Sequence, residues 1–162
     1  MAAPYSQLDF LAEDMLAAYL QQVDDPGVTI YKTLDADSMG DAVDTPCISI
    51  VALSAERAIP EIRNDEAAVA NQSVQISVKV LTGIDAETSG GVQTKTARES
   101  HADLRGRVLD LFNRSTIVAD LNALPVDGIV VQDIGWQNYS RRVVGNGIET
   151  DLLVRMDVYG EE

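Results

Sequence analysis

The residue types that carry most catalytic chemistry are scarce in this sequence. His101 is the only histidine and Cys47 the only cysteine, which excludes paired-histidine metal sites and a disulfide within the chain. A catalytic triad built on His101 would need a serine or Cys47 beside it, and the nucleophile-elbow pattern G-x-S-x-G does not occur. We therefore expect His101 to pack within the fold and Cys47, which lies in an apolar run, to behave as a small buried hydrophobe.

Carboxylates are plentiful, and one acidic loop has part of the spacing of a metal site. Asp35, Asp37 and Gly40 match positions one, three and six of a calcium-binding EF-hand loop. Met39 and Pro46 occupy positions five and twelve, where oxygen ligands belong, so we expect an ordinary acidic loop. Glycine-rich phosphate-binding patterns do not occur either. The sequence predicts no metal, no cofactor and no catalytic residue.

The remaining candidates are contact residues. Arg141 and Arg142 stand out because the chain has only 12 basic residues; the pair predicts either a solvated hairpin or a patch that meets an acidic surface on a neighbouring copy. Trp136 with Tyr139 indicates a core or interface anchor. Polar side chains that alternate along one strand predict a face that meets solvent or a partner: Ser73, Gln75, Ser77 and Lys79.

The charge balance narrows the class of partner. With 26 acidic residues and 12 basic ones, the 162-residue chain has a formal net charge of −14, which argues against a nucleic-acid-binding surface. The N-terminus lacks the pattern of a signal peptide, and no apolar run approaches the roughly 18–20 residues that cross a bilayer. We therefore expect a cytoplasmic product that does not bind membranes.

The main element expected to position these residues spans Thr96–Leu124, as an amphipathic helix with a shorter helical or turn-like tail. Thr96 and Glu99 have the spacing of a capping box, in which each side chain satisfies groups at the helix start. One apolar stripe recurs at three- and four-residue steps: Ala97, His101, Leu104, Val108, Leu111 and Phe112.

The other elements follow from apolar periodicity and turn residues. A first helix is expected over 4–23, strands over 28–33, 46–55, 72–82 and 128–136, a flexible polar loop over 83–95, and a continuation that turns at 145–147 into a last strand over 148–159. The strand over 46–55 is apolar on both faces, which predicts cover on both sides or a central place in the sheet. We predict one α+β domain over residues 1–162, with a mixed, mostly antiparallel sheet, two helices packed on one face, and the order α-β-β-β-α-β-β.

The succession of elements over residues 1–160 carries a resemblance to a known family. It includes HADLRGRVLDLF at 101–112 on the second helix, an LN turn at 121–122, GIVVQDIGW at 128–136 and the final strand ETDLLVRMDVYG at 149–160. In their succession the chain resembles the tail terminator, or tail-completion (head–tail joining), proteins of tailed bacteriophages. The resemblance implies a structural virion protein without enzymatic activity. Such a subunit closes with itself into a ring, usually of six copies, which caps the tail tube and stops its polymerisation.

The resemblance also implies partners and a place in the particle. The ring would contact the tail tube protein on one face and a neck or head-completion protein on the other, and DNA would pass through its lumen without specific binding. It would be assembled in the host cytoplasm and reside in the tail or neck of the virion. Alternatives are a neck or head-completion subunit, a tail tube subunit, and a small acidic cytoplasmic module that binds a basic partner. An enzyme would need a site of carboxylates and hydroxyls, revealed by loss of activity on changing Asp35, Asp37 or His101.

Overall fold

A computed structural model describes residues 7–23, 27–33, 46–57, 71–83, 87–89, 92–144 and 147–160. Its elements in chain order are α1 (Leu8–Leu20), the short 3-10 helix η2 (Gln21–Val23), β1 (Thr29–Lys32), β2 (Cys47–Arg57), β3 (Asn71–Gly83), β4 (Glu87–Ser89), β5 (Val92–Lys95), α2 (Ala97–Phe112), α3 (Ile117–Asn122), β6 (Ile129–Val144) and β7 (Gly147–Gly160). The predicted acidic loop and residues 58–70 lie outside the described residues, as do Ser6 and Pro4 at the expected start of the first helix. The assignment of residues 1–162 to one domain stays a prediction.

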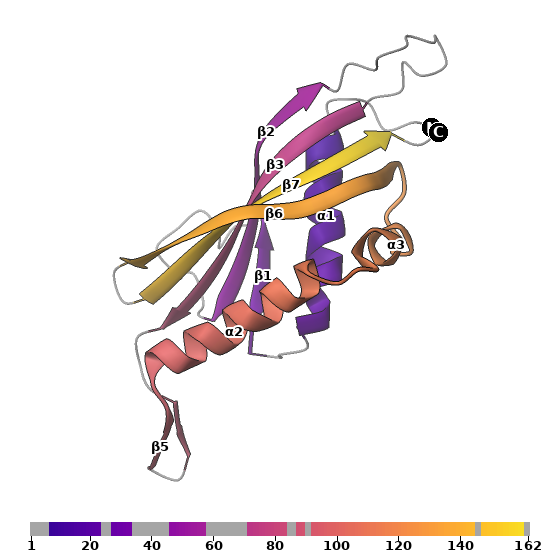
Figure 1. The fold of residues 1–162 in the computed structure, drawn as a ribbon. Coiled ribbons are helices and arrows are strands. Elements are labelled where there is room, and N and C mark those ends of the chain that lie inside the picture. Colours follow the sequence, from indigo (N-terminus) through magenta and orange to yellow (C-terminus); the bar gives the residue numbers. More distant parts are fainter. Residues whose placement is uncertain are drawn as a thin grey trace, which may run out of the picture.

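Five strands form one sheet in the order β1-β2-β3-β7-β6 (Figure 1). β1 pairs with β2 in parallel, and the other three pairings are antiparallel. β6 is therefore an edge strand, and β-bulges interrupt its pairing with β7 at two places. The predicted α+β class, with a mixed and mostly antiparallel sheet, is confirmed.

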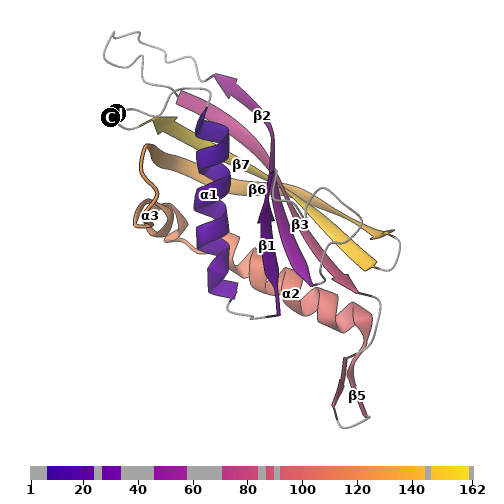
Figure 2. The ribbon, with the colours of Figure 1, turned by 180° about the vertical axis from the view of Figure 1, so that it is seen from behind.

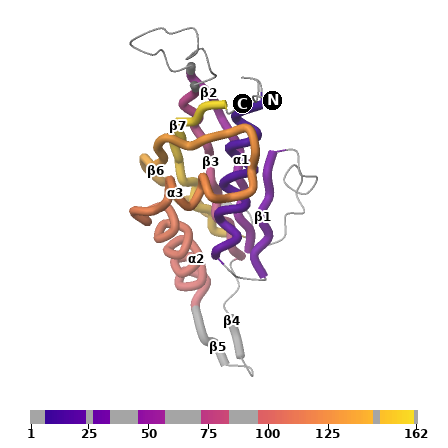
Figure 3. The backbone as a smooth tube through the Cα atoms, turned by 90° about the vertical axis from the view of Figure 1, so that its right-hand side faces the viewer, coloured from indigo at the N-terminus to yellow at the C-terminus, as the bar shows by residue number. Residues whose placement is uncertain are grey.

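The helices lie on one face of this sheet. Figure 2 shows α1 in front of the strands with α2 beside it, and in Figure 3 α1 lies between β1 on one side and α2 with α3 on the other. The strands supply the facing apolar side chains because successive residues point to opposite faces. In β3 and β7 these buried side chains are Val74, Ile76, Val78, Val80, Leu152, Val154, Met156 and Val158. The alternation predicted for both strands is confirmed.

α2 begins and packs as its sequence predicts. The Thr96 hydroxyl accepts a hydrogen bond from the backbone N–H of Glu99 at 3.1 Å and donates to the Glu99 carboxylate at 3.1 Å. This satisfies one of the N–H groups that a helix start leaves without a partner. Five members of the predicted stripe are buried: His101, Leu104, Val108, Leu111 and Phe112. α3 forms the predicted shorter tail, and Gly128, with a φ of 88°, occupies the left-handed region just before β6.

A buried carboxylate ties α1 to the sheet. Glu13 is 2% exposed, and it accepts hydrogen bonds from the backbone N–H of Thr33 at 2.8 Å, from the Thr33 hydroxyl at 2.8 Å and from the backbone N–H of Ala52 at 3.0 Å. On the other side of α1 the buried Tyr19 hydroxyl donates to the carbonyl of Leu111 in α2 at 2.6 Å. Both polar groups are thus satisfied inside the fold, as burial requires.

Two expectations about strands need correction. β2 was expected to be covered on both sides or to be central in the sheet. It lies between β1 and β3, yet its second half is not covered: residues 53–56 are exposed and Leu53 is 60% exposed. The bulge between Ala52 and Ser54 shifts the register between β2 and β3. β1 pairs with β2 only from Cys47 to Ile50. The stretch over 83–95, expected to be a flexible loop, contains the antiparallel hairpin β4–β5.

The long hairpin at the C-terminus turns where expected. Val144 at the end of β6 pairs with Gly147 at the start of β7, and the two residues between them lie outside the described part of the chain. β6 runs without interruption through Trp136, so the strand and the continuation predicted after it are one element. No helix among the described residues has the length and apolar character to cross a membrane.

Candidate functional site

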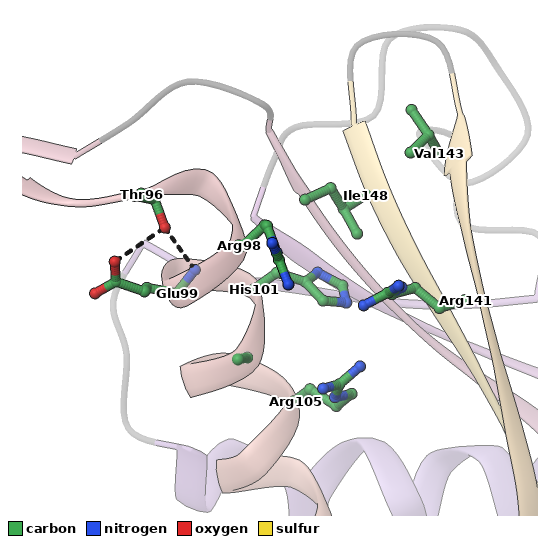
Figure 4. Close-up of a pocket in the computed structure, with 9 residues that line it drawn as sticks. Thr96, Arg98, Glu99, His101, Arg105, Arg141, Val143 and Ile148 are labelled. Carbon is green, nitrogen blue, oxygen red and sulfur yellow. Dashed lines mark hydrogen bonds between the residues drawn. The ribbon is translucent and has the colours of Figure 1, made fainter.

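A pocket of about 660 Å³ lies between the first two turns of α2 and the hairpin end of β6 and β7. Three arginines line it: Arg98 and Arg105 from α2, and Arg141 from β6. Figure 4 shows the three guanidinium groups gathered around the ring of His101. Glu99, at the rim, is the one acidic side chain among the lining residues, and it is engaged with Thr96 at the helix cap.

The local structure explains why these arginines meet. Arg98 and Arg105 are seven residues apart, close to two turns of a helix, so they lie on the same side of α2. Arg141 pairs in register with Thr150 of β7, whose side chain lies on the face that the helices cover. A helix packed across a sheet thus brings together cations that are far apart in sequence.

His101 forms the floor of the pocket. It is 2% exposed, and its Nδ1 lies 2.9 Å from the Thr82 hydroxyl and its Nε2 2.6 Å from the Thr150 hydroxyl. A neutral imidazole has one donor and one acceptor, and threonine hydroxyls can serve as either. Burial lowers the pKa of His101, and the charges of Arg105 and Arg141 lower it further. The ring is therefore neutral near pH 7, and the positive charge of the pocket belongs to the arginines.

An aromatic pair supports Arg105. Its guanidinium lies over the ring of Tyr139, 5.2 Å from the ring centroid, a cation–π arrangement. The Tyr139 ring lies 6.1 Å from that of Trp136, whose indole N–H donates to the Asn113 side chain at 2.9 Å. Trp136 is half-buried and packs against the core. Its fixed position restricts the position of Tyr139, and therefore that of Arg105.

The arginines have spare binding capacity. Among the described residues, neither Arg98 nor Arg141 forms an ion pair, and Arg105 has only its contact with Tyr139. A guanidinium presents a planar set of donors that matches a carboxylate or phosphate. The pocket therefore has the chemistry of an anion-binding site.

The predicted contact residues divide between the two faces of the sheet. Arg141, Tyr139 and Trp136 lie on the helix side, whereas Arg142 points the other way and forms an ion pair with Glu149 at 2.6 Å. Neighbouring residues on a strand point to opposite faces, so Arg141 and Arg142 cannot form one patch.

The polar positions of β3 lie on the face away from the helices. Ser77 is only 3% exposed and donates to the Asp151 carboxylate at 2.5 Å, and Ser73 accepts from Arg155 at 2.7 Å. Gln75 and Lys79 are half-buried on the same face. These side chains form a second polar surface, part of which is already satisfied by β7.

Two arginines of the pocket, Arg98 and Arg105, were not among the predicted contact residues. Their seven-residue spacing on a helix, in a chain with 12 basic residues, was the available signal. In the part of the chain that the structure describes, no three histidine, cysteine or acidic side chains come together as a metal site would require. Cys47 is buried, as predicted.

The comparisons with known proteins are distant. No protein-family model matches the chain, and no curated protein matches it. Among solved structures, the chain is similar to one in the virion of a native gene transfer agent particle, with 13% sequence identity and a TM-score of 0.45 over 93% of this chain and 92% of that chain. A likeness at this level carries no argument about function.

Proposed function

We propose that this chain is a structural subunit of a phage-like virion, which closes into a ring that caps the tail tube, ends tail polymerisation and joins the tail to the neck or head. The proposal starts from the resemblance of the element succession over residues 1–160, with the segments 101–112, 128–136 and 149–160, to tail terminator proteins. Its partners would be further copies of itself, the tail tube protein and a neck or head-completion protein, and its place would be the tail or neck of the virion.

The observation that carries the proposal is that one subunit has two chemically different surfaces, one on each face of the sheet. The pocket of Arg98, Arg105 and Arg141 is cationic and lies on the helix side. The polar surface of β3 and β7 lies on the opposite face of the sheet. A closed ring of identical subunits needs at least two different patches on each subunit, and the cationic pocket would supply one of them. The polar surface would meet a neighbour or line the lumen, where its Asp151 and Asp157 would keep DNA phosphates from binding.

The test is electron microscopy of the purified protein at low and high salt. Rings with a central hole that never lengthen would support a terminator, whereas long cylinders would show a tail tube subunit and overturn the capping role. Rings that bind head or neck proteins but do not bind tail tubes would show a neck or head-completion subunit. Compact single particles at every concentration, which also fail to bind isolated tail tubes, would favour a small acidic binding module.

A further inference from the structure

We propose that the arginine pocket receives the carboxylates of Asp127 and Asp133 from a second copy of this chain. The inference rests on the proposed ring function, because it names the contact that joins one subunit to the next. It concerns two patches near opposite ends of the edge strand β6: the arginine pocket, and the carboxylates of Asp127 and Asp133.

The first patch has cations without acidic partners among the described residues. Arg98 and Arg141 are exposed and form no ion pair within the described residues, and Arg105 is held in place by Tyr139. His101, at the floor of the pocket, is buried, and its neutral ring adds no positive charge. Three guanidinium groups this close repel one another until an anion enters, so an acidic ligand gains more here than at an isolated arginine.

The second patch has carboxylates without cationic partners among the described residues. Residues 115–140 include three aspartates and no lysine or arginine. One of the three, Asp120, accepts a hydrogen bond from Thr116. Asp127 and Asp133 are exposed and form no ion pair among the described residues; Asp133 accepts only the backbone N–H of the next residue, at 2.9 Å.

A second copy is the occupant that this charge distribution favours. The chain has 26 acidic and 12 basic residues, so acidic surface is abundant on every copy. Within the described part of the chain, the pocket brings together three arginines that form no ion pair. Apolar side chains stand next to the arginines: Val143 is 75% exposed and Tyr139 44% exposed. Exposed apolar and aromatic side chains beside charged groups are typical of protein–protein contacts and would be covered by a neighbouring subunit.

The two patches cannot meet within one molecule. Asp133 and Arg141 are eight residues apart on one strand, about 26 Å at the usual rise of a β-strand. A contact between them must therefore join two copies. Repeated in one direction around a ring it is heterologous, and formed twice between two copies it gives a two-fold dimer.

A charge-swap experiment tests the contact by sedimentation velocity over a range of concentrations. Arg141→Glu and Asp133→Arg should each weaken self-association by about tenfold or more, because each places like charges together. The double variant restores an opposite-charge pair and should associate nearly as the unmodified chain does. Its net charge is unchanged at −14, since one substitution removes two charge units and the other adds two.

Matched controls separate the contact from general charge effects and from unfolding. Arg114→Glu and Asp110→Arg change the charge by the same amounts at exposed positions outside both patches and should leave association unchanged. Arg98→Glu places an acid in the first turn of α2, where the helix dipole favours it. It should therefore weaken association while the thermal unfolding temperature is maintained.

Each outcome bears on the contact or on the ring separately. Rings that persist in Arg141→Glu and Asp133→Arg would overturn the contact and leave the ring function standing. Two-fold dimers that respond to the charge swap would support the contact and overturn the ring. An unmodified chain that stays monomeric would overturn the contact; titration with inorganic phosphate, lost in Arg141→Glu, would then assign the pocket to a free anion. Failure of the double variant to recover would also overturn it.

Discussion

His101 holds two strands to α2 through its two ring nitrogens, and burial beside two arginines disfavours a positive charge on its ring. The neutral ring bridges Thr82 and Thr150. A protonated ring would have to donate from both nitrogens and would sit, buried, beside Arg105 and Arg141. The fold therefore favours the neutral form, and this preference links stability to pH.

We predict that stability falls as the pH is lowered through the ordinary pKa of histidine, 6.5. The pKa of His101 is lowered in the folded state, so below 6.5 the unfolded chain binds more protons than the folded one. The stabilising contribution is complete above 6.5 and decreases as the pH falls toward the folded-state pKa. Urea unfolding at about pH 7.5 and about pH 5.5 measures the change.

The control for this prediction is His101→Gln. His101 is the only histidine, so no other side chain has an ordinary pKa in that pH range. The substituted chain should lose most of the difference in unfolding free energy between the two pH values. If its pH dependence equals that of the unmodified chain, carboxylates are responsible and His101 is not.

At the scale of elements, Glu13 determines how α1 attaches to the sheet. Its carboxylate accepts three hydrogen bonds from Thr33, which directly follows β1, and Ala52, in the middle of β2. β1 is an edge strand of four residues, so it has few ladder bonds of its own. The hydrogen bonds to the Glu13 carboxylate add to the few ladder bonds that hold this short strand.

We predict that Glu13→Ala lowers the free energy of unfolding by about 2–3 kcal/mol, because it leaves buried donors without acceptors. Asp14→Ala is the matched control at the next helix position. Asp14 forms a half-exposed ion pair with Lys32 at 2.7 Å, which is worth at most about 1 kcal/mol. Urea unfolding compares the two, and equal losses would contradict the role assigned to Glu13.

Elements with a strong local signal were predictable from the sequence. α2 combines a cap at Thr96 with a regular apolar stripe, and β3 and β7 alternate without interruption, so periodicity alone defines their buried faces. β2 and the hairpin β4–β5 were predicted less well. The exposure of Leu53 depends on a bulge and on how far β1 extends, and both are properties of the assembled sheet.

The pocket was less predictable because it depends on tertiary packing. Arg98 and Arg141 are 43 residues apart and come together only because α2 crosses the sheet near the end of β6. The separation of Arg141 from Arg142 was foreseeable, since adjacent strand residues point to opposite faces. The pairing of Arg142 with Glu149 depends on the register between β6 and β7, which is a property of the assembled sheet.

At the scale of the whole molecule, two charge effects oppose each other. Each copy carries a net charge of −14, so copies repel one another over long distances. The proposed contact is attractive but local, and it becomes partly desolvated when the pocket is covered. Screening acts mainly on exposed, widely separated charges and less on buried pairs.

We therefore predict that added salt first strengthens self-association. From about 0.01 M to about 0.1 M salt the Debye length falls from about 30 Å to about 10 Å, which removes most of the long-range repulsion and leaves the close Arg141–Asp133 contact largely intact. Sedimentation velocity at the two salt concentrations measures the effect.

The charge-swapped double variant has the same net charge, so its self-association should rise with salt in the same way. Self-association of Arg141→Glu should remain weak at both concentrations because its local contact is repulsive. Association that is indifferent to ionic strength would mean that net charge does not limit assembly. A steady decrease with salt would mean that attraction at contacts of this kind outweighs the repulsion at every distance.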